Sequence, residues 1–238
     1  MTVWFATGNI HKKKELADIL SDAIPGSSPK GKAFEIKIPG EAGLDFDPEE
    51  TGTTFLENAL IKARECQRLL EEKGVLRRGE PVIADDSGIC VDALGGRPGI
   101  FSARYSGRYS GPGVPGAPDE TPGIKLNAVE RNALLLAELG ENPLRSARFV
   151  CAMVLYYSAD RFFAAQETLE GELVTNAAAA RGEGGFGYDP ILCIPELGRT
   201  VAELSDEEKN RLSHRGKAGR VIAKILMPAT KHAEHECQ

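Results

Sequence analysis

The chain has 238 residues, of which 42% are apolar and 27% charged, values ordinary for a soluble globular protein with a sizeable core. A formal net charge of −6 argues against a strongly basic nucleic-acid-binding surface, although local lysines can still bind a small anion. Because no apolar run approaches the roughly 20 residues of a membrane span and no basic segment opens the chain, we expect neither a membrane partner nor a secretion signal.

The cysteines indicate a reducing setting. The chain has 5 cysteines and no CxxC pair, and four of the five lie in apolar or helical runs where a free thiol packs as a small hydrophobe. We therefore expect a cytoplasmic protein without disulfides. The ending "HAEHEC" contains metal-ligand types, but its polar surroundings favour a disordered tail over residues 228–238.

The first half of the chain predicts a strand–turn–helix unit and a second helix. A strand at "VWFA" is followed by the turn "TGN" and a helix over residues 10–24, with one apolar side formed by Ile10, Leu16, Ile19, Leu20 and Ala23. After a strand at 33–38, a long amphipathic helix is predicted over 55–73, closed by Gly74. The run "PVIADD" predicts a buried strand with Asp85 and Asp86 at its carboxyl end.

The second half opens with a Pro/Gly-rich segment, at about 107–123, that predicts a long surface loop. A helix over 124–139 follows, and then two strands, 147–157 and 161–173, joined as a hairpin. A further helix is predicted to start within residues 205–212, and a last helix is predicted over residues 217–227. This order predicts an α/β fold with a mixed central sheet flanked by helices, in one domain over residues 1–238.

The "TGN" turn points to anion binding. A helix that starts after a glycine turn directs free backbone N–H groups and a partial positive charge toward the turn. Lys12, Lys13 and Lys14 place further positive charge in the first helical turn, which does not stabilise a helix by itself. A bound polyanion would explain them, and a solvated basic face is the alternative.

Three acids form a candidate metal site. Asp85 and Asp86 are adjacent, with no basic residue within five positions, and like charges side by side cost stability. Glu57 completes the capping box Thr54-x-x-Glu57, so it either caps its helix or joins these acids at a divalent cation. Mg²⁺ prefers such oxygen ligands together with substrate phosphates. In the second capping box, Ser205-x-x-Glu208, we expect Glu208 only to cap its helix.

Two later stretches fit recognition of a base or a phosphate. "GPGVPG" and "GEGGFG" both match GxGxxG, but neither follows a strand and opens a helix, so neither is a dinucleotide fingerprint. "GEGGFGYDP" instead places an aromatic ring and an acid where a planar base could stack, with a plain turn as the alternative. "EKNRLSHRGKAGR" gathers cations suited to phosphate and base contacts, or to a helix end.

Taken together, these stretches resemble the Ham1/inosine triphosphatase family, whose members hydrolyse deaminated purine nucleotides. The likeness rests on "TGNIHKKKEL", "ETGTTFLENALIKA", "ADDSGICVDALGGRPGIFSARYSG", "GEGGFGYDPIL" and "ELSDEEKNRLSHRGKA", in that order. It implies Mg²⁺-dependent hydrolysis of ITP, dITP and XTP to the monophosphate and pyrophosphate, with Mn²⁺ as a substitute metal. It also implies two lobes around an active-site cleft, and a homodimer.

The resemblance also assigns roles to individual residues. It implies that Glu57 and Asp86 hold Mg²⁺ and that Asp86 accepts the proton of the attacking water, with Asp85 in support. Substrate binding is implied for the remaining motif residues: Thr7, Gly8, Asn9, Lys12, Ser87, Phe186, Gly187, Tyr188, Asp189, Lys209, His214 and Arg215.

Two stretches depart from the family pattern, and two other functions compete. The segments 27–50 and 109–123 are longer than the resemblance leads us to expect, which affects cleft access and dimer contacts but no motif.

The competing functions are a Maf-like pyrophosphatase for modified pyrimidine nucleotides and a non-catalytic nucleotide sensor. "SHRGKA" and "GFGYDP" argue against the first, and the intact acids argue against the second. A third alternative, a nucleic-acid-binding module, does not fit, because the chain lacks the positive charge and the interleaved aromatic and basic residues that such a module needs.

Overall fold

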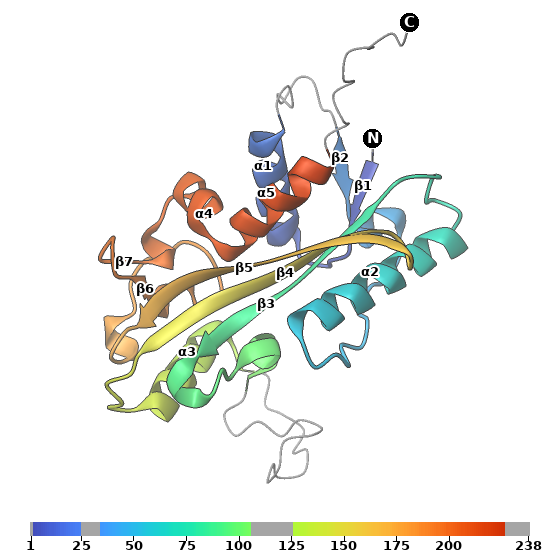
Figure 1. Ribbon diagram of the computed structural model, residues 1–238. Helices are drawn as coiled ribbons and strands as arrows, with labels where there is room; N and C mark the ends of the chain where they lie inside the picture. Colours follow the sequence, from blue (N-terminus) through green and yellow to red (C-terminus); the bar gives the residue numbers. More distant parts are fainter. Residues whose placement is uncertain (1, 25–33, 106–125, 227–238) are drawn as a thin grey trace, which may run out of the picture. The chain divides into compact units, whose positions relative to one another are not determined.

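A computed structural model of the chain describes residues 2–24, 34–105 and 126–226 (Figure 1). The predicted loop at 107–123 and tail at 228–238 lie outside the described residues, as does part of the long segment 27–50. Seven strands form one sheet in the order β2-β1-β3-β4-β5-β6-β7. Their bounds are Thr2–Phe5 (β1), Glu35–Lys37 (β2), Val82–Val91 (β3), Ser146–Ser158 (β4), Arg161–Leu173 (β5), Leu192–Ile194 (β6) and Arg199–Thr200 (β7).

The sheet is mixed, which confirms the predicted fold class. Strand β1 is parallel to both β2 and β3, whereas β6 is antiparallel to β5 and β7. The principal helices are Ile10–Ala23 (α1), Phe55–Glu72 (α2), Ala128–Leu139 (α3), Asp206–Leu212 (α4) and His214–Leu226 (α5). No helix in the described part of the chain is long and apolar enough to cross a membrane.

The chain divides into two compact units that both draw on the long central strands. Unit 1 contains residues 1–85, 152–167 and 215–238, and unit 2 contains residues 86–151 and 168–214. The division falls between Asp85 and Asp86 and again between His214 and Arg215, so it passes through two of the motifs.

In unit 1, helices cover both faces of the sheet (Figure 1). One face of β1 and β3 packs against α2, because alternate strand residues share a face with the buried side of that helix. The residues of this cluster include Trp4, Ala6, Ala59, Ala63, Cys66, Leu70, Val82 and Ala84. Helices α1 and α5 lie together on the other face, where a Cβ at Gly219 would come within 2.7 Å of Ile19. Glycine thus permits the close packing of these two helices.

Unit 2 is built around α3 and the remaining strand segments. Its core joins the apolar side of α3 to inward residues of the second half of β3, the first half of β4 and the end of β5. The members of this core include Ile89, Val91, Tyr105, Leu135, Leu139, Phe149, Leu169, Tyr188 and Leu192.

Four sequence expectations need correction. Helix α3 begins at Ala128, after its cap Asn127, and not at residue 124. Ile10 is 59% exposed instead of buried, because it opens α1 ahead of the first buried position, Leu16. Strand β3 does not end at the paired acids but continues through them to Val91. Helix α5 begins at His214, three residues before the predicted start, because Gly216 lies within the helix instead of ending it.

The four described cysteines, Cys66, Cys90, Cys151 and Cys193, are free thiols. Burial, with a smaller contribution from the charge of Glu65, raises the pKa of the Cys66 thiol to about 12. Because the thiolate is the reactive form, we expect Cys66 to resist iodoacetamide in the folded protein at about pH 8, and to react after unfolding in urea. Peptide mass spectrometry measures this. Labelling of native Cys66 as fast as the half-buried Cys193 would contradict the packing of α2.

Candidate active site

The turn between β1 and α1 is built by its own polar side chains. The Asn9 side chain caps α1 by accepting hydrogen bonds from the backbone N–H groups of His11 and Lys12, at 2.9 and 3.3 Å. The hydroxyl of Thr7 accepts one from the backbone N–H of Asn9, at 3.1 Å. A Cβ at Gly8 would meet only the backbone oxygen of Phe46, at 4.0 Å, so packing within the protein leaves room for a larger residue there.

Lys12 and Lys13, in the first turn of α1, are paired with acids of the protein. Lys12 Nζ donates to both carboxylate oxygens of Asp85, at 3.1 and 3.2 Å. Lys13 Nζ donates to Glu41 at 2.7 Å, on the surface. Carboxylates of the protein itself therefore balance part of the unusual positive charge at this helix start.

Asp85 is almost completely buried in unit 1. It is 1% exposed and accepts hydrogen bonds from Nε and Nη2 of Arg215, at 3.1 and 2.9 Å, as well as from Lys12. Burial alone would raise the pKa of Asp85, but the charges of Lys12, Arg215 and Lys62 hold it well below its ordinary value. The carboxylate is therefore ionised and committed to cations of the protein.

Glu57 caps α2 as the capping box predicts. Its Oε2 accepts hydrogen bonds from the backbone N–H and hydroxyl of Thr53, both at 2.7 Å, and from the backbone N–H of Thr54 at 3.2 Å. The hydroxyl of Thr54 accepts in return from the backbone N–H of Glu57. Hydrogen bonds from Thr53 lower the pKa of Glu57. The cap uses Oε2, so this exposed, ionised side chain keeps Oε1 for another ligand.

Asp86 and Ser87 lie in the part of β3 that belongs to unit 2. Because successive residues of a strand point to opposite faces, Asp86 projects to the face opposite Asp85. Its side chain is buried. In the described ranges no group of three or more His, Cys, Asp or Glu side chains is arranged to hold a metal ion.

Within unit 2, the "GEGGFGYDP" loop and α4 bring an aromatic ring, a lysine and an acid together. Asp189 is buried, and its Oδ2 accepts from the backbone N–H of Phe186 at 2.8 Å and from Lys209 Nζ at 2.8 Å. Lys209 Nζ also lies 4.7 Å from the centroid of the Phe186 ring, which is 42% exposed. Asp189 thus fixes both a stacking surface and a hydrogen-bond donor beside it.

The rest of this loop is held from behind. Gly185 has a φ of +71°, and a Cβ there would lie 2.0 Å from Asp189 Oδ2, so only glycine fits. The carbonyl of Gly187 accepts from Asn132 Nδ2 at 3.1 Å, and the hydroxyl of buried Tyr188 donates to the carbonyl of Ser102 at 2.9 Å. Gly187 and Tyr188 therefore act here as backbone and core supports for the Phe186 surface.

The first two residues of α5 belong to different units. His214, in unit 2, stacks on Phe149 with ring centroids 4.9 Å apart. Arg215, in unit 1, is 1% exposed and donates through Nη1 to Glu15 Oε2 at 2.8 Å, in addition to its bonds with Asp85. The expectation that Arg215 contacts substrate stays a prediction, and its guanidinium is occupied by the two acids.

The structure thus groups the predicted site residues by unit. Unit 1 holds the turn residues Thr7, Gly8 and Asn9 together with Lys12, Glu57 and Arg215, and unit 2 holds Asp86, Ser87, Phe186, Gly187, Tyr188, Asp189, Lys209 and His214.

Sequence reasoning missed two charged residues of unit 1. Glu15 binds Arg215, and buried Lys62 pairs with Glu50 at 2.9 Å while its charge acts on Asp85. Both are charged residues in otherwise ordinary amphipathic helices. The only signal at the sequence level was their position inside motifs, where they looked like solvent-facing charges.

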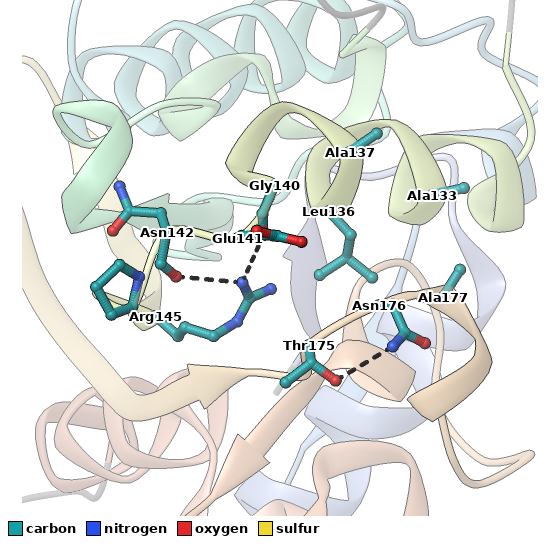
Figure 2. Close-up of a pocket in the computed structure, with 11 residues that line it drawn as sticks. Ala133, Leu136, Ala137, Gly140, Glu141, Asn142, Arg145, Thr175, Asn176 and Ala177 are labelled. Atoms are coloured by element: carbon teal, nitrogen blue, oxygen red, sulfur yellow. Dashed lines mark hydrogen bonds between the residues drawn. The ribbon is translucent and has the colours of Figure 1, made fainter.

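A pocket of about 710 Å³ lies elsewhere in unit 2, between α3, the segment 140–145 that leads into β4, and residues 175–177 after β5 (Figure 2). Arg145 closes one side by donating to four backbone carbonyls, those of Gly140, Asn142, Leu173 and Val174. None of the predicted site residues lines this pocket.

The mixed sheet, the capped turn after β1 and the aromatic surface beside Lys209 define an α/β protein with features suited to a nucleoside polyphosphate. The chain belongs to the Ham1 family, whose model matches residues 3–225.

Relatives cover nearly the whole chain. A Treponema denticola protein named dITP/XTP pyrophosphatase is 42% identical over 95% of this chain and 98% of its own length. A protein of the same name from Geobacillus kaustophilus is 45% identical over 90% of this chain and 88% of its own. The solved structure of the Staphylococcus aureus Ham1 protein matches with a TM-score of 0.72 and 32% identity, over 95% of this chain and 98% of that one.

Proposed function

We propose that the protein hydrolyses deaminated purine nucleoside triphosphates, ITP, dITP and XTP, to the monophosphate and pyrophosphate. The full-length likeness to relatives named dITP/XTP pyrophosphatase carries this proposal, because it covers the motifs of both units. The role of the protein is to remove deaminated nucleotides from the cellular nucleotide pool. The local geometry supports each part of the reaction in turn.

The β1–α1 turn binds the triphosphate. Gly8 supports this assignment, because the packing of the protein leaves its Cβ position open and a phosphate approaching the backbone would fill that space. Thr7 and Asn9 hold the turn in shape, and Lys12 supplies the positive charge. Lys12 would then contact the phosphates while it stays paired with Asp85.

Glu57 and Asp86 hold Mg²⁺, with Mn²⁺ as a substitute. The donor set fits the metal: both are hard carboxylate ligands, and Glu57 keeps one oxygen outside its helix cap. A cluster of three protein acids is not required, because Mg²⁺ completes its shell with water and substrate phosphates. The bound ion would neutralise phosphate charge and lower the pKa of a coordinated water.

Asp86 orients and deprotonates the attacking water. The water oxygen forms a bond to the α-phosphorus, the bond from that phosphorus to the bridging oxygen breaks, and pyrophosphate leaves. Asp85 is a poor choice for this proton, since two cations already hold its carboxylate. The pairing of Asp85 with two cations therefore supports the catalytic role that the resemblance implies for Asp86, on the opposite face of β3.

The base stacks on Phe186 and is selected by hydrogen-bond donors. Lys209 lies beside the ring, and the resemblance adds His214 and Arg215 as further donors. A 6-oxo group accepts hydrogen bonds from such donors. The exocyclic amine of adenine is itself a donor, so it would leave the buried donors of the protein without an acceptor.

A nucleotide panel tests this function. Pyrophosphate release should be fast with ITP, dITP and XTP, at least about 10²-fold slower with ATP, and dependent on Mg²⁺. Preference for dTTP or modified pyrimidine nucleotides would favour the Maf-like alternative. Tight ITP binding without pyrophosphate release would favour the sensor.

We also propose that the protein is a cytoplasmic homodimer, as the family resemblance implies. Sedimentation equilibrium would show twice the 25.6 kDa mass of one chain. A monomer over the micromolar range would contradict the proposal.

Removing the stacking ring should weaken binding of the nucleotide and spare the chemistry. Base–aromatic stacking contributes about 1–3 kcal/mol, so Phe186→Ala should raise KM for ITP by about 5- to 150-fold with little change in kcat. Phe163→Ala is the matched control, because Phe163 is 39% exposed on β5 and outside the motifs. An equal effect of both substitutions, or none from Phe186→Ala, would argue against stacking.

A further inference from the structure

We propose that Glu15 is a positioning residue for the phosphate-binding lysine, acting on Lys12 through Arg215 and Asp85. The inference rests on the proposed function, in which Lys12 contacts the triphosphate. Glu15 lies within the stretch "TGNIHKKKEL", but the resemblance gives it no role.

The four side chains form one continuous chain of contacts inside unit 1. Glu15 Oε2 accepts from Arg215 Nη1 at 2.8 Å, and Asp85 Oδ2 accepts from Nε and Nη2 of the same guanidinium. Lys12 Nζ donates to both oxygens of Asp85. Helix α1 therefore supplies the first and the last side chain of this series of contacts, while α5 and β3 supply the two side chains between them.

Burial makes these contacts interdependent. The Arg215 and Asp85 side chains are each 1% exposed, and the Glu15 side chain is 11% exposed. Two cations and two anions balance, so the cluster carries no net formal charge. A buried charge left without its partner is strongly destabilising, which means that Arg215 must keep a counter-charge.

Glu15 allows Asp85 to serve two cations. With Glu15 in place, Arg215 is neutralised from both sides and Asp85 keeps both oxygens within reach of Lys12. Without that charge, buried Arg215 would draw Asp85 to itself. Lys12, which has a flexible stem and is partly exposed, would be released.

Holding Lys12 in advance favours phosphate binding. Ordering one long side chain on binding costs enough to weaken affinity by about 2- to 10-fold. A pre-ordered lysine has already lost that freedom when the ligand arrives. The effect of Glu15 should therefore appear in the affinity for phosphates alone.

Calorimetric titration of the full chain with inorganic tripolyphosphate tests this role. Glu15→Gln should weaken binding about 3- to 10-fold, although it removes a negative charge and general electrostatics alone would tighten binding of a polyanion. Asp22→Asn is the matched control, an exposed acid on the same helix that should leave affinity equal or slightly higher.

A second arm shows whether Glu15 acts through Lys12. In a Lys12→Met background, adding Glu15→Gln should cause no further loss of affinity. If Glu15→Gln does not fold, Glu15→Asp keeps the charge but shortens the reach to Arg215 and should also weaken binding. The inference is overturned if a folded Glu15 variant binds tripolyphosphate as tightly as the wild-type protein or more tightly. It is also overturned if Glu15→Gln causes the same loss of affinity in the Lys12→Met background as in the wild-type background.

The inference and the proposed function can fail separately. If the wild-type protein hydrolyses ITP and binds tripolyphosphate but the Glu15 variants match it, only the positioning role is wrong. If the wild-type protein turns over no deaminated nucleotide, the proposed function itself is wrong. Turnover of ITP without tripolyphosphate binding would remove the phosphate role of Lys12 and, with it, the positioning role of Glu15.

Discussion

Replacing Asp86 with asparagine should lower kcat for ITP by about 10³-fold, within the range expected for loss of a general base. The amide keeps the shape of the side chain but cannot take the proton of the attacking water, and it is a weaker ligand for Mg²⁺. Steady-state pyrophosphate release measures the loss.

Two controls make this experiment specific. The far-ultraviolet circular dichroism of Asp86→Asn should equal that of the wild-type protein, and ITP binding without metal should change by less than about threefold. Asp160→Asn, in the turn between β4 and β5 and far along the chain from every motif, should leave kcat unchanged. Near-wild-type turnover by Asp86→Asn would remove Asp86 from the catalytic role.

Asp85→Asn should instead act mainly on stability, lowering the free energy of unfolding by about 3–5 kcal/mol. The substitution removes the counter-charge between Arg215 and Lys12 in a site where the arginine is almost completely buried. Urea denaturation followed by circular dichroism gives the value.

The matched control for Asp85 is Asp92, which pairs with Arg148 on the surface at 2.5 Å. Because exposed ion pairs contribute little, Asp92→Asn should cost less than about 1 kcal/mol. A loss at Asp85 no larger than the loss at Asp92 would mean that the buried cluster does not stabilise the fold as its geometry indicates.

Much of the fold could be predicted because its signals are local. The caps at Thr54 and Ser205 and the hairpin between β4 and β5 were confirmed, since capping boxes and strand alternation depend on residues close in sequence. The five motifs were also local, and they led to the family that the comparisons confirm.

The charge network could not be predicted, because its partners are distant in sequence. Asp85 has no basic neighbour in the chain, yet its cations come from 73 and 130 positions away. Those cations also explain why β3 can continue through two acids to Val91, where the sequence suggested an end. Pairing across the fold, which no local pattern shows, gives Asp85 its structural role.

The same limit applies to Arg215. In the sequence it is one cation of a basic cluster, and the resemblance assigns it to the substrate. In the structure its guanidinium is buried between Glu15 and Asp85. These two contacts could not be predicted from the local pattern, and the substrate contact of Arg215 stays a prediction.

The most direct test of the proposed reaction identifies its products. Phosphorus-31 nuclear magnetic resonance of ITP incubated with the wild-type protein and Mg²⁺ should show the loss of all three triphosphate signals together. IMP and pyrophosphate should appear in equal amounts. Formation of IDP and orthophosphate, or no change in ITP, would contradict cleavage between the α- and β-phosphates and with it the proposed function.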